Sequence, residues 1–454
     1  MKSIAGSKSP ALVQLLEWIF NPLGYLQTNH QKFGDCFQMH FTGFPPFVMV
    51  SHPEMIEQIF TAPASQFDVG NSNFLLLPTL GENSLLLLDG DRHQRQRQLL
   101  MPPFHGERMR AYGQLICQIT EQVIDQWQLD QPFTLRDSMQ EISLQLIIEA
   151  VFGVREGDRV VQLKRLLQEL IEAMTSVSGT VAMFFSSLQL DLGDWSPSGK
   201  LLRRRAQIDQ LIFAEIAERR QTPNPDRTDI LNLMMLAVDE AGQPMTDQEL
   251  RDELMTLLIA GHETTATALT WSIYWIHRLP AVKDKLLQEL ASLPDHPDPS
   301  SIAKLSYLSA VCSETLRIYP IALMTQLRTV KAPFQCGNHL FPPGTILAGC
   351  IHLLHQRPDL YPDPEQFRPE RFLERQFSAY EYIPFGGGNR RCIGAAFALF
   401  EMKLALATIL SHCQLTLAET KPVLPKRRGL TMTAAGGVKM ALSDRRSLPH
   451  LAPS

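Results

Sequence analysis

The stretch Pro384–Gly394 constrains the fold more than any other, because three consecutive glycines stand directly before a helix-forming segment. Glycines 386–388 cannot lie comfortably inside a helix or a strand, so the sequence predicts a loop with unusual backbone angles. The residues from 395 to 405 are strong helix formers. One cysteine, Cys392, is therefore predicted where a glycine-rich loop becomes a helix.

This predicted position of Cys392 favours an ionised sulfur. Free backbone N–H groups and the positive end of the helix dipole stabilise an anion there, and Arg390 and Arg391 add positive charge. We expect a lowered pKa for the thiol, and a thiolate is either a nucleophile or a metal ligand. Because no second cysteine stands at the spacing of a zinc site, a single bond to haem iron is favoured. A small buried hydrophobic residue is the alternative.

The residues around Cys392 form the pattern F-x-x-G-x-R-x-C-x-G, whose fixed positions are Phe385, Gly388, Arg390, Cys392 and Gly394. This pattern resembles the haem-binding signature of the cytochrome P-450 family. The resemblance implies haem b as the cofactor, with the Cys392 sulfur as the iron ligand. It also implies that Phe385, Arg390 and Gly394 contact the cofactor. The fold that it implies is the mainly α P-450 fold with a smaller β region.

A second motif lies in the middle of a long predicted helix. A capping box at residues 246–249 starts this helix, and the apolar pattern continues to about residue 278. Within it, Ala260–Thr265 is a poor helical turn, and such a local conflict hints at function. It resembles the oxygen-binding motif of P-450 enzymes, which implies a groove for dioxygen at Gly261 and a proton relay through Glu263 and Thr264. A kinked core helix is the alternative.

Four basic residues are candidates for anchoring the cofactor. His93 and Arg97 are four residues apart and share one face of a predicted helix. Taken alone, such a pair is more often a solvated helix turn. The resemblance implies instead that both bind the haem propionates, together with Arg328 and Arg390.

An E-x-x-R pair, Glu314 and Arg317, precedes a proline-rich segment that contains Arg371. The pair alone is common and stabilises an exposed helix by only about 0.2–0.5 kcal/mol. With Arg371 it resembles the Glu-Arg-Arg lock of the P-450 family. These three residues are therefore expected to be structural, holding the cysteine loop in place.

Composition limits the class of protein. The 454 residues are 44% hydrophobic and 20% charged, as in globular proteins, and the net charge of −5 argues against general nucleic-acid binding. Seven scattered cysteines indicate no disulfide framework, which favours a reducing, cytoplasmic location. The apolar stretch 11–20 is too short for a transmembrane anchor. We expect it to pack on the body as a helix, with loose membrane contact as the alternative.

The resemblance covers about residues 20–440 and implies one catalytic domain over 1–454. We expect a β-rich N-terminal part at about 35–65, a helical body at about 89–320 and a haem-binding part at about 320–440. The apolar stretch 67–88 reads as a long functional loop. The stretch 174–195 reads either as a lid over a substrate pocket or as an ordinary connection between helices.

The implied substrate site is lined by apolar residues, and the tentative members are Phe74, Leu77, Leu257, Leu323, Met324 and Met432. Such a lining favours a small apolar substrate, namely a long-chain fatty acid, an alkane or a terpenoid. The implied reaction is haem-thiolate monooxygenation, which inserts one oxygen atom from dioxygen.

The chain carries no nucleotide fingerprint and no flavin domain of its own. Electrons must then come from a separate ferredoxin or flavodoxin with its reductase, and the protein itself is expected to be a monomer. Arg92, Arg95, Arg391 and Lys403 could form a basic patch for an acidic carrier, or be ordinary solvated charges. A peroxygenase or isomerase is the alternative activity, and a non-enzymatic haem sensor is a more remote one.

Overall fold

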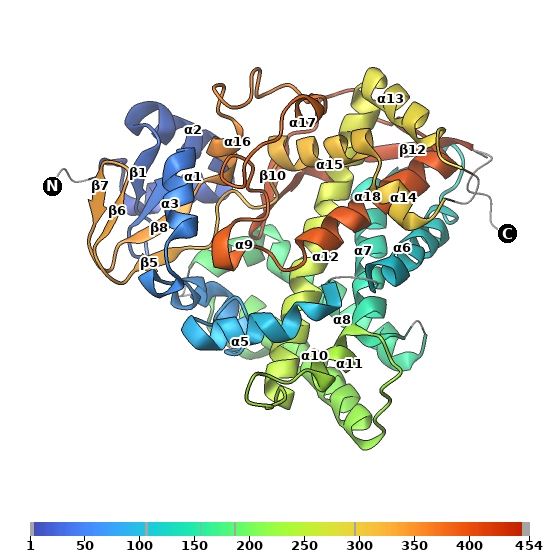
Figure 1. The fold of residues 1–454 in the computed structure, drawn as a ribbon, viewed down its shortest axis with the longest axis horizontal. Coiled ribbons are helices and arrows are strands. Elements are labelled where there is room, and N and C mark those ends of the chain that lie inside the picture. The colour runs from blue at the N-terminus through green and yellow to red at the C-terminus, as the bar shows by residue number, and fades with distance from the viewer. Residues whose placement is uncertain (1–3, 105–107, 155, 186–187, 295–296, 447–454) are drawn as a thin grey trace.

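The computed structural model describes residues 4–104, 108–154, 156–185, 188–294 and 297–446. The chain folds mainly into helices with several small sheets, as predicted (Figure 1). The helices are α1 Ala11–Phe20, α2 Pro22–Phe33, α3 Pro53–Thr61, α4 Leu77–Leu80, α5 Gly90–Leu100, α6 Arg108–Ile124, α7 Leu135–Phe152, α8 Asp158–Thr175, α9 Val177–Phe184, α10 Pro197–Gln221, α11 Ile230–Leu236, α12 Asp247–Arg278, α13 Pro280–Leu290, α14 Pro299–Ala303, α15 Ser306–Ile318, α16 Ile351–His355, α17 Arg371–Glu374 and α18 Ala395–His412.

The strands are short, and most of them come from the N-terminal and C-terminal parts of the chain. They are β1 Cys36–Met39, β2 Phe47–Val50, β3 Phe67–Asp68, β4 Pro132–Thr134, β5 Arg328–Val330, β6 Phe334–Cys336, β7 His339–Phe341, β8 Ile346–Gly349, β9 Cys413–Leu417, β10 Pro425–Arg428, β11 Thr431–Ala434 and β12 Lys439–Arg445. The largest sheet has the order β1-β2-β8-β5-β3, with β2 and β8 parallel. The β-rich N-terminal part therefore shares one sheet with β5 and β8, which places Arg328 of β5 at a fixed position.

Helix α12 runs through the centre of the molecule and packs against α7, α10, α15 and α18 (Figure 1). Its predicted capping box is present: the Thr246 hydroxyl accepts from the Glu249 backbone N–H at 3.2 Å, and the Glu249 carboxylate accepts from the Thr246 N–H at 2.8 Å. Most of its side chains are buried, because it is apolar on several faces. The long helix thus carries the Ala260–Thr265 segment into the core.

Two other stretches hold more regular structure than the sequence suggests. The predicted loop 67–88 contains a 3-10 helix at Gly70–Leu76 and then α4. The predicted lid region 174–195 contains α9, which begins directly after α8 and is capped by the Ser176 side chain. Its residues 186–187 lie outside the described part of the chain.

Two apolar helices bear on the question of membrane contact. Helix α18 is long and apolar enough to cross a membrane, but 67% of it is buried inside the protein, so it is a core helix. Helix α1 packs on the body through Leu15, Trp18 and Ile19, as expected, and leaves Leu12 and Phe20 exposed.

Candidate active site

The loop before Cys392 needs its glycines for two physical reasons. Gly386 and Gly388 have φ values of +66° and +65°, a region that favours glycine. A Cβ on Gly387 would lie 2.1 Å from the Phe60 ring, and one on Gly388 would lie 2.6 Å from the Phe60 carbonyl oxygen. The loop therefore packs its backbone directly on the end of α3. The Cys392 N–H then donates to the Phe385 carbonyl at 3.0 Å, just before α18 begins.

The Cys392 thiol is accessible to solvent but crowded by protein atoms on its other sides. This burial raises its pKa, although the Gly394 backbone N–H and the charges of Arg97 and Arg391 act in the opposite direction. The expected low thiol pKa is therefore wrong for the free thiol, because desolvation outweighs the nearby positive charge. A metal bound to the sulfur removes the proton outright.

A cluster of cations stands beside the cysteine loop. His93 and Arg97 come from α5, Arg328 from β5 and Arg390 from the loop itself. Burial and the charges of Arg390, Arg97 and Arg328 lower the pKa of His93 to about 3. Burial, and then Arg390, lower the pKa of Arg328 to about 10. The structure therefore brings the four predicted anchoring residues together.

The positive charge of this cluster is only partly compensated. Arg390 forms an ion pair with Asp89 at 2.6 Å, and Arg328 donates to the Gly387 carbonyl at 3.1 Å. The buried Nε atoms of Arg328 and Arg390 have no partner among the described residues. Buried cations without counter-ions are costly, so this cluster is suited to bind carboxylates. The propionates of a haem fit that requirement, and Cys392 fits the need for one soft ligand.

The predicted oxygen-binding motif sits mid-way along α12, where Ala260 is exposed and Gly261 and Thr264 are partly accessible in an otherwise buried helix. The Thr264 hydroxyl donates to the Ala260 carbonyl at 2.7 Å. A Cβ on Gly261 would meet only Ile147 among the described residues, at an ordinary 3.4 Å. Packing within the protein therefore does not require a glycine at position 261. Its missing side chain instead leaves room beside the helix.

Glu263 is held by residues that the sequence analysis missed. Its Oε2 accepts from the Gln140 amide at 2.6 Å, and its Oε1 lies 4.0 Å from the Arg428 Nε. Burial raises the pKa of Glu263, and these two groups lower it. The Thr264 hydroxyl donates to the Ala260 carbonyl of its own helix rather than to Glu263. No sequence signal pointed to these partners, because Gln140 and Arg428 are far along the chain from Glu263. The same holds for Asp89, which is far from Arg390.

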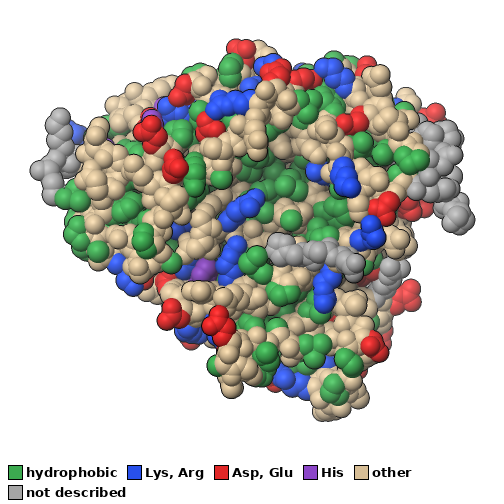
Figure 2. Space-filling view, viewed as in Figure 1, with side chains coloured by type: hydrophobic (Ala, Val, Ile, Leu, Met, Phe, Trp, Pro, Cys, Tyr) green, Lys and Arg blue, Asp and Glu red, His purple; other side chains and the backbone are tan. Residues whose placement is uncertain are grey.

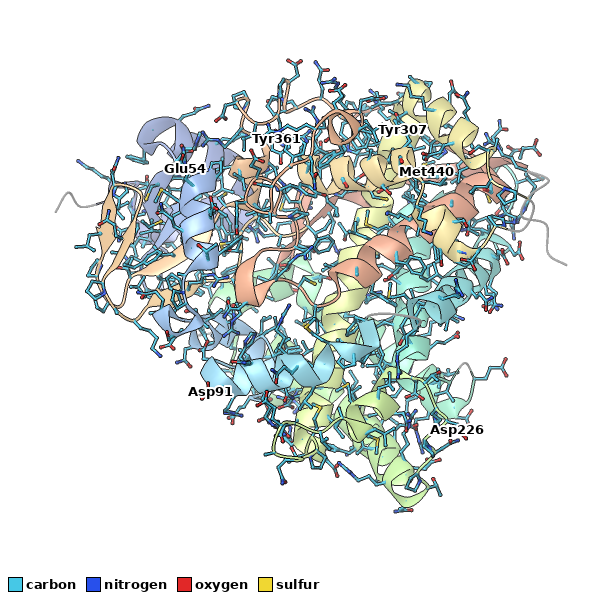
Figure 3. The ribbon with its side chains drawn as sticks, in the orientation of Figure 1. Glu54, Asp91, Asp226, Tyr307, Tyr361 and Met440 are labelled. Atoms are coloured by element: carbon cyan, nitrogen blue, oxygen red, sulfur yellow. The ribbon has the colours of Figure 1, made fainter. Side chains whose placement is uncertain are left out.

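The predicted lock is assembled as expected. Glu314 lies 2.7 Å from Arg317 and 3.1 Å from Arg371, and all three side chains are buried. The guanidinium of Arg317, a residue of α15, also lies over the Tyr361 ring at 5.3 Å. Figure 3 shows Tyr361 in the upper part of the molecule. Removing one partner of such a buried pair costs about 3–5 kcal/mol, so this cluster fixes the segment that leads to the cysteine loop.

Comparison with known proteins decides the family. The profile described as Cytochrome P450 matches residues 8–439. The chain belongs to the cytochrome P450 family. It is 35% identical to the Mycobacterium tuberculosis protein named as cytochrome P450 135B1, over 98% of this chain and 92% of the relative. It is 32% identical to the one named as cytochrome P450 138, over 96% of each chain.

Solved structures agree on the fold. A retinoic-acid-bound cyanobacterial CYP120A1 matches with a TM-score of 0.84 and 24% identity, covering 97% of this chain and 99% of that one. The haem domain of cytochrome P450DA matches with a TM-score of 0.84 and 23% identity, covering 99% of both chains. The protein is thus a haem-thiolate enzyme of a monooxygenase family, and the cofactor prediction is confirmed at that level.

The six tentative substrate residues of this P450 do not form one continuous group. Leu323, Met324 and Met432 belong to one apolar cluster, whereas Leu257 belongs to the main core beside α12. Phe74 and Leu77 are 45% and 40% exposed. Phe74 reaches the first cluster indirectly, because its ring packs on Phe44, which packs on Phe184.

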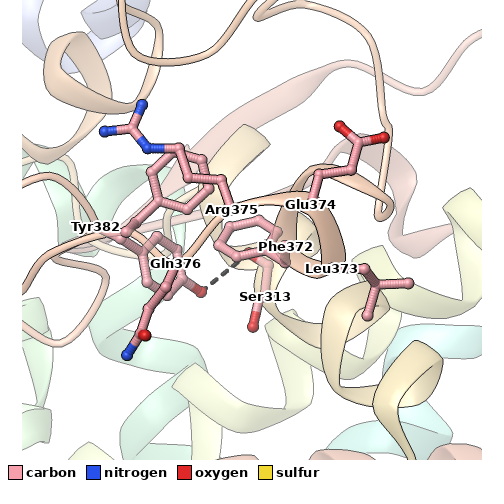
Figure 4. Close-up of a pocket in the computed structure, with 8 residues that line it drawn as sticks. Ser313, Phe372, Leu373, Glu374, Arg375, Gln376 and Tyr382 are labelled. Atoms are coloured by element: carbon pink, nitrogen blue, oxygen red, sulfur yellow. Dashed lines mark hydrogen bonds between the residues drawn. The ribbon is translucent and has the colours of Figure 1, made fainter.

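A surface pocket of about 460 Å³ lies elsewhere in the P450, between α15 and the segment after α17. Its lining residues are Ser313, Phe372, Leu373, Glu374, Arg375, Gln376, Phe377 and Tyr382 (Figure 4). None of the predicted site residues lines it. The Tyr382 hydroxyl donates to the Ser313 carbonyl at 2.9 Å, so its polar groups serve the protein's own structure.

The predicted basic patch is smaller than expected. Arg95 is paired with Asp239 at 2.6 Å and Glu249 at 2.9 Å, and the Lys403 ammonium donates to the Ala303 carbonyl at 2.8 Å. Arg92 and Arg391 remain exposed. On the face shown in Figure 2, Lys and Arg side chains stand at several separate places around a central hollow.

Proposed function

We propose that this P450 is a single catalytic unit that inserts one oxygen atom from dioxygen into an apolar substrate, a fatty acid, alkane or terpenoid. Cys392 would bind the iron, and His93, Arg97, Arg328 and Arg390 would hold the propionates. Bound haem supplies the dioxygen chemistry, helped by electron donation from the thiolate. The observation that carries these assignments is the buried cation cluster beside a single accessible cysteine.

The protein groups around Thr264 would deliver protons. Burial raises the pKa of Glu263 above that of a free carboxyl group, which favours its protonated form, and Gln140 and Arg428 fix its position. The Thr264 hydroxyl stands on the accessible side of the helix, one residue further on.

We also infer a cytoplasmic monomer that receives electrons from a ferredoxin or flavodoxin. The intact acid–threonine pair disfavours a peroxygenase or isomerase.

The test of this activity combines a spectrum with turnover. Carbon monoxide added to the reduced protein should give the red-shifted Soret band of thiolate-ligated haem, and Cys392→Ala should abolish it. Product should form with NADPH, ferredoxin and reductase. Product formation with hydrogen peroxide alone, and none with the electron carriers, would instead support a peroxygenase.

The proton-delivery role has its own test. Replacing Thr264 by Ala should leave the carbon monoxide spectrum intact and lower the product formed per NADPH consumed by at least roughly tenfold, since positioned proton transfer contributes roughly 10²–10⁴-fold to a rate. Thr267→Val, at a buried hydroxyl on the same helix, is the matched control. Unchanged coupling in Thr264→Ala would show that the hydroxyl has no part in proton delivery.

A further inference from the structure

Two neighbouring arginines on β10 have opposite surroundings. Arg428 forms an ion pair with Glu172 at 2.7 Å and lies near Glu263. Arg427 has no carboxylate within 4.0 Å among the described residues. Its guanidinium lies over the Trp18 ring at 4.5 Å, and its Nη1 donates to the Gly429 carbonyl at a long 3.5 Å. The Nε and Nη2 atoms of Arg427 are buried and have no partner in the described structure.

An unpaired buried guanidinium is costly for the protein. Burial lowers the pKa of Arg427 to about 10, so the side chain still carries its charge at neutral pH. Stacking on Trp18 offsets part of that cost, but an aromatic ring supplies no counter-charge. Folding therefore leaves Arg427 with a requirement for an anion that the described residues do not meet.

The strand register places Arg427 in an apolar environment. Arg427 pairs with Met432 of β11 in the antiparallel hairpin, so their side chains lie on the same face. Met432 belongs to the apolar cluster that contains Trp18, Leu323 and Phe184. Arg427 is therefore the cationic member of a surface that is otherwise apolar and aromatic.

Two hydrogen bonds connect this surface to the proposed reaction site. The Met432 N–H donates to the Ile321 carbonyl at 2.9 Å, and residues 321–328 lead directly to Arg328 in the cation cluster. The Trp271 indole of α12 donates to the Met432 carbonyl at 3.4 Å. The same cluster also contains Leu323 and Met324, which the sequence analysis assigned to the substrate site.

We propose that Arg427 binds the carboxylate of the substrate, so that this P450 acts on amphipathic carboxylic acids rather than on neutral hydrocarbons. The two unpartnered atoms, Nε and Nη2, form one edge of the guanidinium, and that edge can donate two parallel hydrogen bonds to a carboxylate. The apolar body of the acid would lie on Leu323, Met324 and Met432. This inference rests on the proposed function and narrows its substrate class.

The test compares matched acids and alcohols on the haem-loaded protein. Palmitic acid is titrated against hexadecan-1-ol, and farnesoic acid against farnesol, by spin-state spectra and equilibrium dialysis. In at least one pair the acid should bind tenfold or more tightly than the alcohol. Arg427→Met should lose that preference and leave alcohol binding within about twofold, because only the carboxylate forms charge-assisted hydrogen bonds with Arg427.

The control is Lys426→Gln, which removes an exposed charge from the neighbouring position, opposite Thr433. It should keep the acid preference. Equal affinity for acid and alcohol in every pair would overturn the inference. An equal loss of affinity for acid and alcohol in Arg427→Met would also overturn it, because that is the result expected of an arginine with only a structural role. Oxidation of the alcohols by the wild type and by Arg427→Met reports on the monooxygenase proposal separately, because it does not involve the carboxylate.

Discussion

Three arginines stand beside His93, and Asp89 is the one carboxylate paired with them among the described residues. The same arrangement that stabilises an anionic cofactor makes the protein without it electrostatically unfavourable. The four members come from α5, β5 and the cysteine loop, so no short sequence window could reveal the cluster. Their common role was implied only by the family resemblance.

Replacing Arg328 by Met should accelerate haem release to apomyoglobin by roughly tenfold to a hundredfold. The reason is the loss of a charge-assisted hydrogen bond worth about 1.5–3 kcal/mol. The control is Arg95→Met, because Arg95 is paired with Asp239 and Glu249 instead. Equal release rates in the wild type and Arg328→Met would show that Arg328 does not hold the cofactor.

At the level of elements, the cysteine loop is positioned by close packing on α3. Gly386 and Gly388 have nearly the same φ, but a Cβ would be unopposed at Gly386 and only 2.6 Å from the Phe60 carbonyl oxygen at Gly388. Gly388→Ala should therefore lower Tm clearly more than Gly386→Ala. Both substitutions add backbone strain of about 1–2 kcal/mol, but only Gly388→Ala also adds a clash with Phe60. Thermal unfolding of the haem-loaded variants measures this. Equal losses would show that backbone strain alone requires the glycines.

Helices α18 and α7 meet at a buried acid that should make stability depend on pH. Burial raises the pKa of Glu401 from 4.5 to about 8, with Ser143 of α7 as its hydrogen-bond partner. Between these values the folded state keeps a proton that the unfolded state releases. The free energy of unfolding should thus fall as pH rises, by up to about 1.4 kcal/mol per pH unit, until about pH 8.

Glu401→Gln should remove this slope, and urea unfolding across that pH range measures it. Glu57→Gln, at an exposed carboxylate of α3, should keep it. A slope that is the same in the wild type and Glu401→Gln would mean that Glu401 is already ionised in the folded protein.

Across the whole molecule, the sequence was informative where one segment carries its own signal. The capping box set the start of α12, and the glycine loop set the position of Cys392 before α18. Sequence reasoning failed where distant elements decide the outcome. The thiol pKa depends on burial by surrounding segments, Glu263 is held by Gln140 of α7, and Arg427 depends on Trp18 of α1. Local patterns do not encode such contacts.

Electron delivery is a property of the whole surface, and only part of the predicted basic patch is free to act in it. Arg391 is exposed directly beside Cys392, whereas the Lys403 ammonium is bonded to the Ala303 carbonyl. Arg391→Gln should therefore slow reduction by an acidic ferredoxin severalfold at low salt, and much less at high salt, where charges beyond a few ångströms are screened.

Stopped-flow reduction under carbon monoxide measures this rate, and an unchanged Soret band shows that Cys392 still binds the iron. Lys403→Gln should leave the rate close to that of the wild type, because its charge is turned into the protein. If the two variants slowed reduction equally, or if Arg391→Gln had the same effect at all salt concentrations, the carrier would not dock through the exposed charge beside the cysteine. The docking surface would then have to lie elsewhere on the molecule.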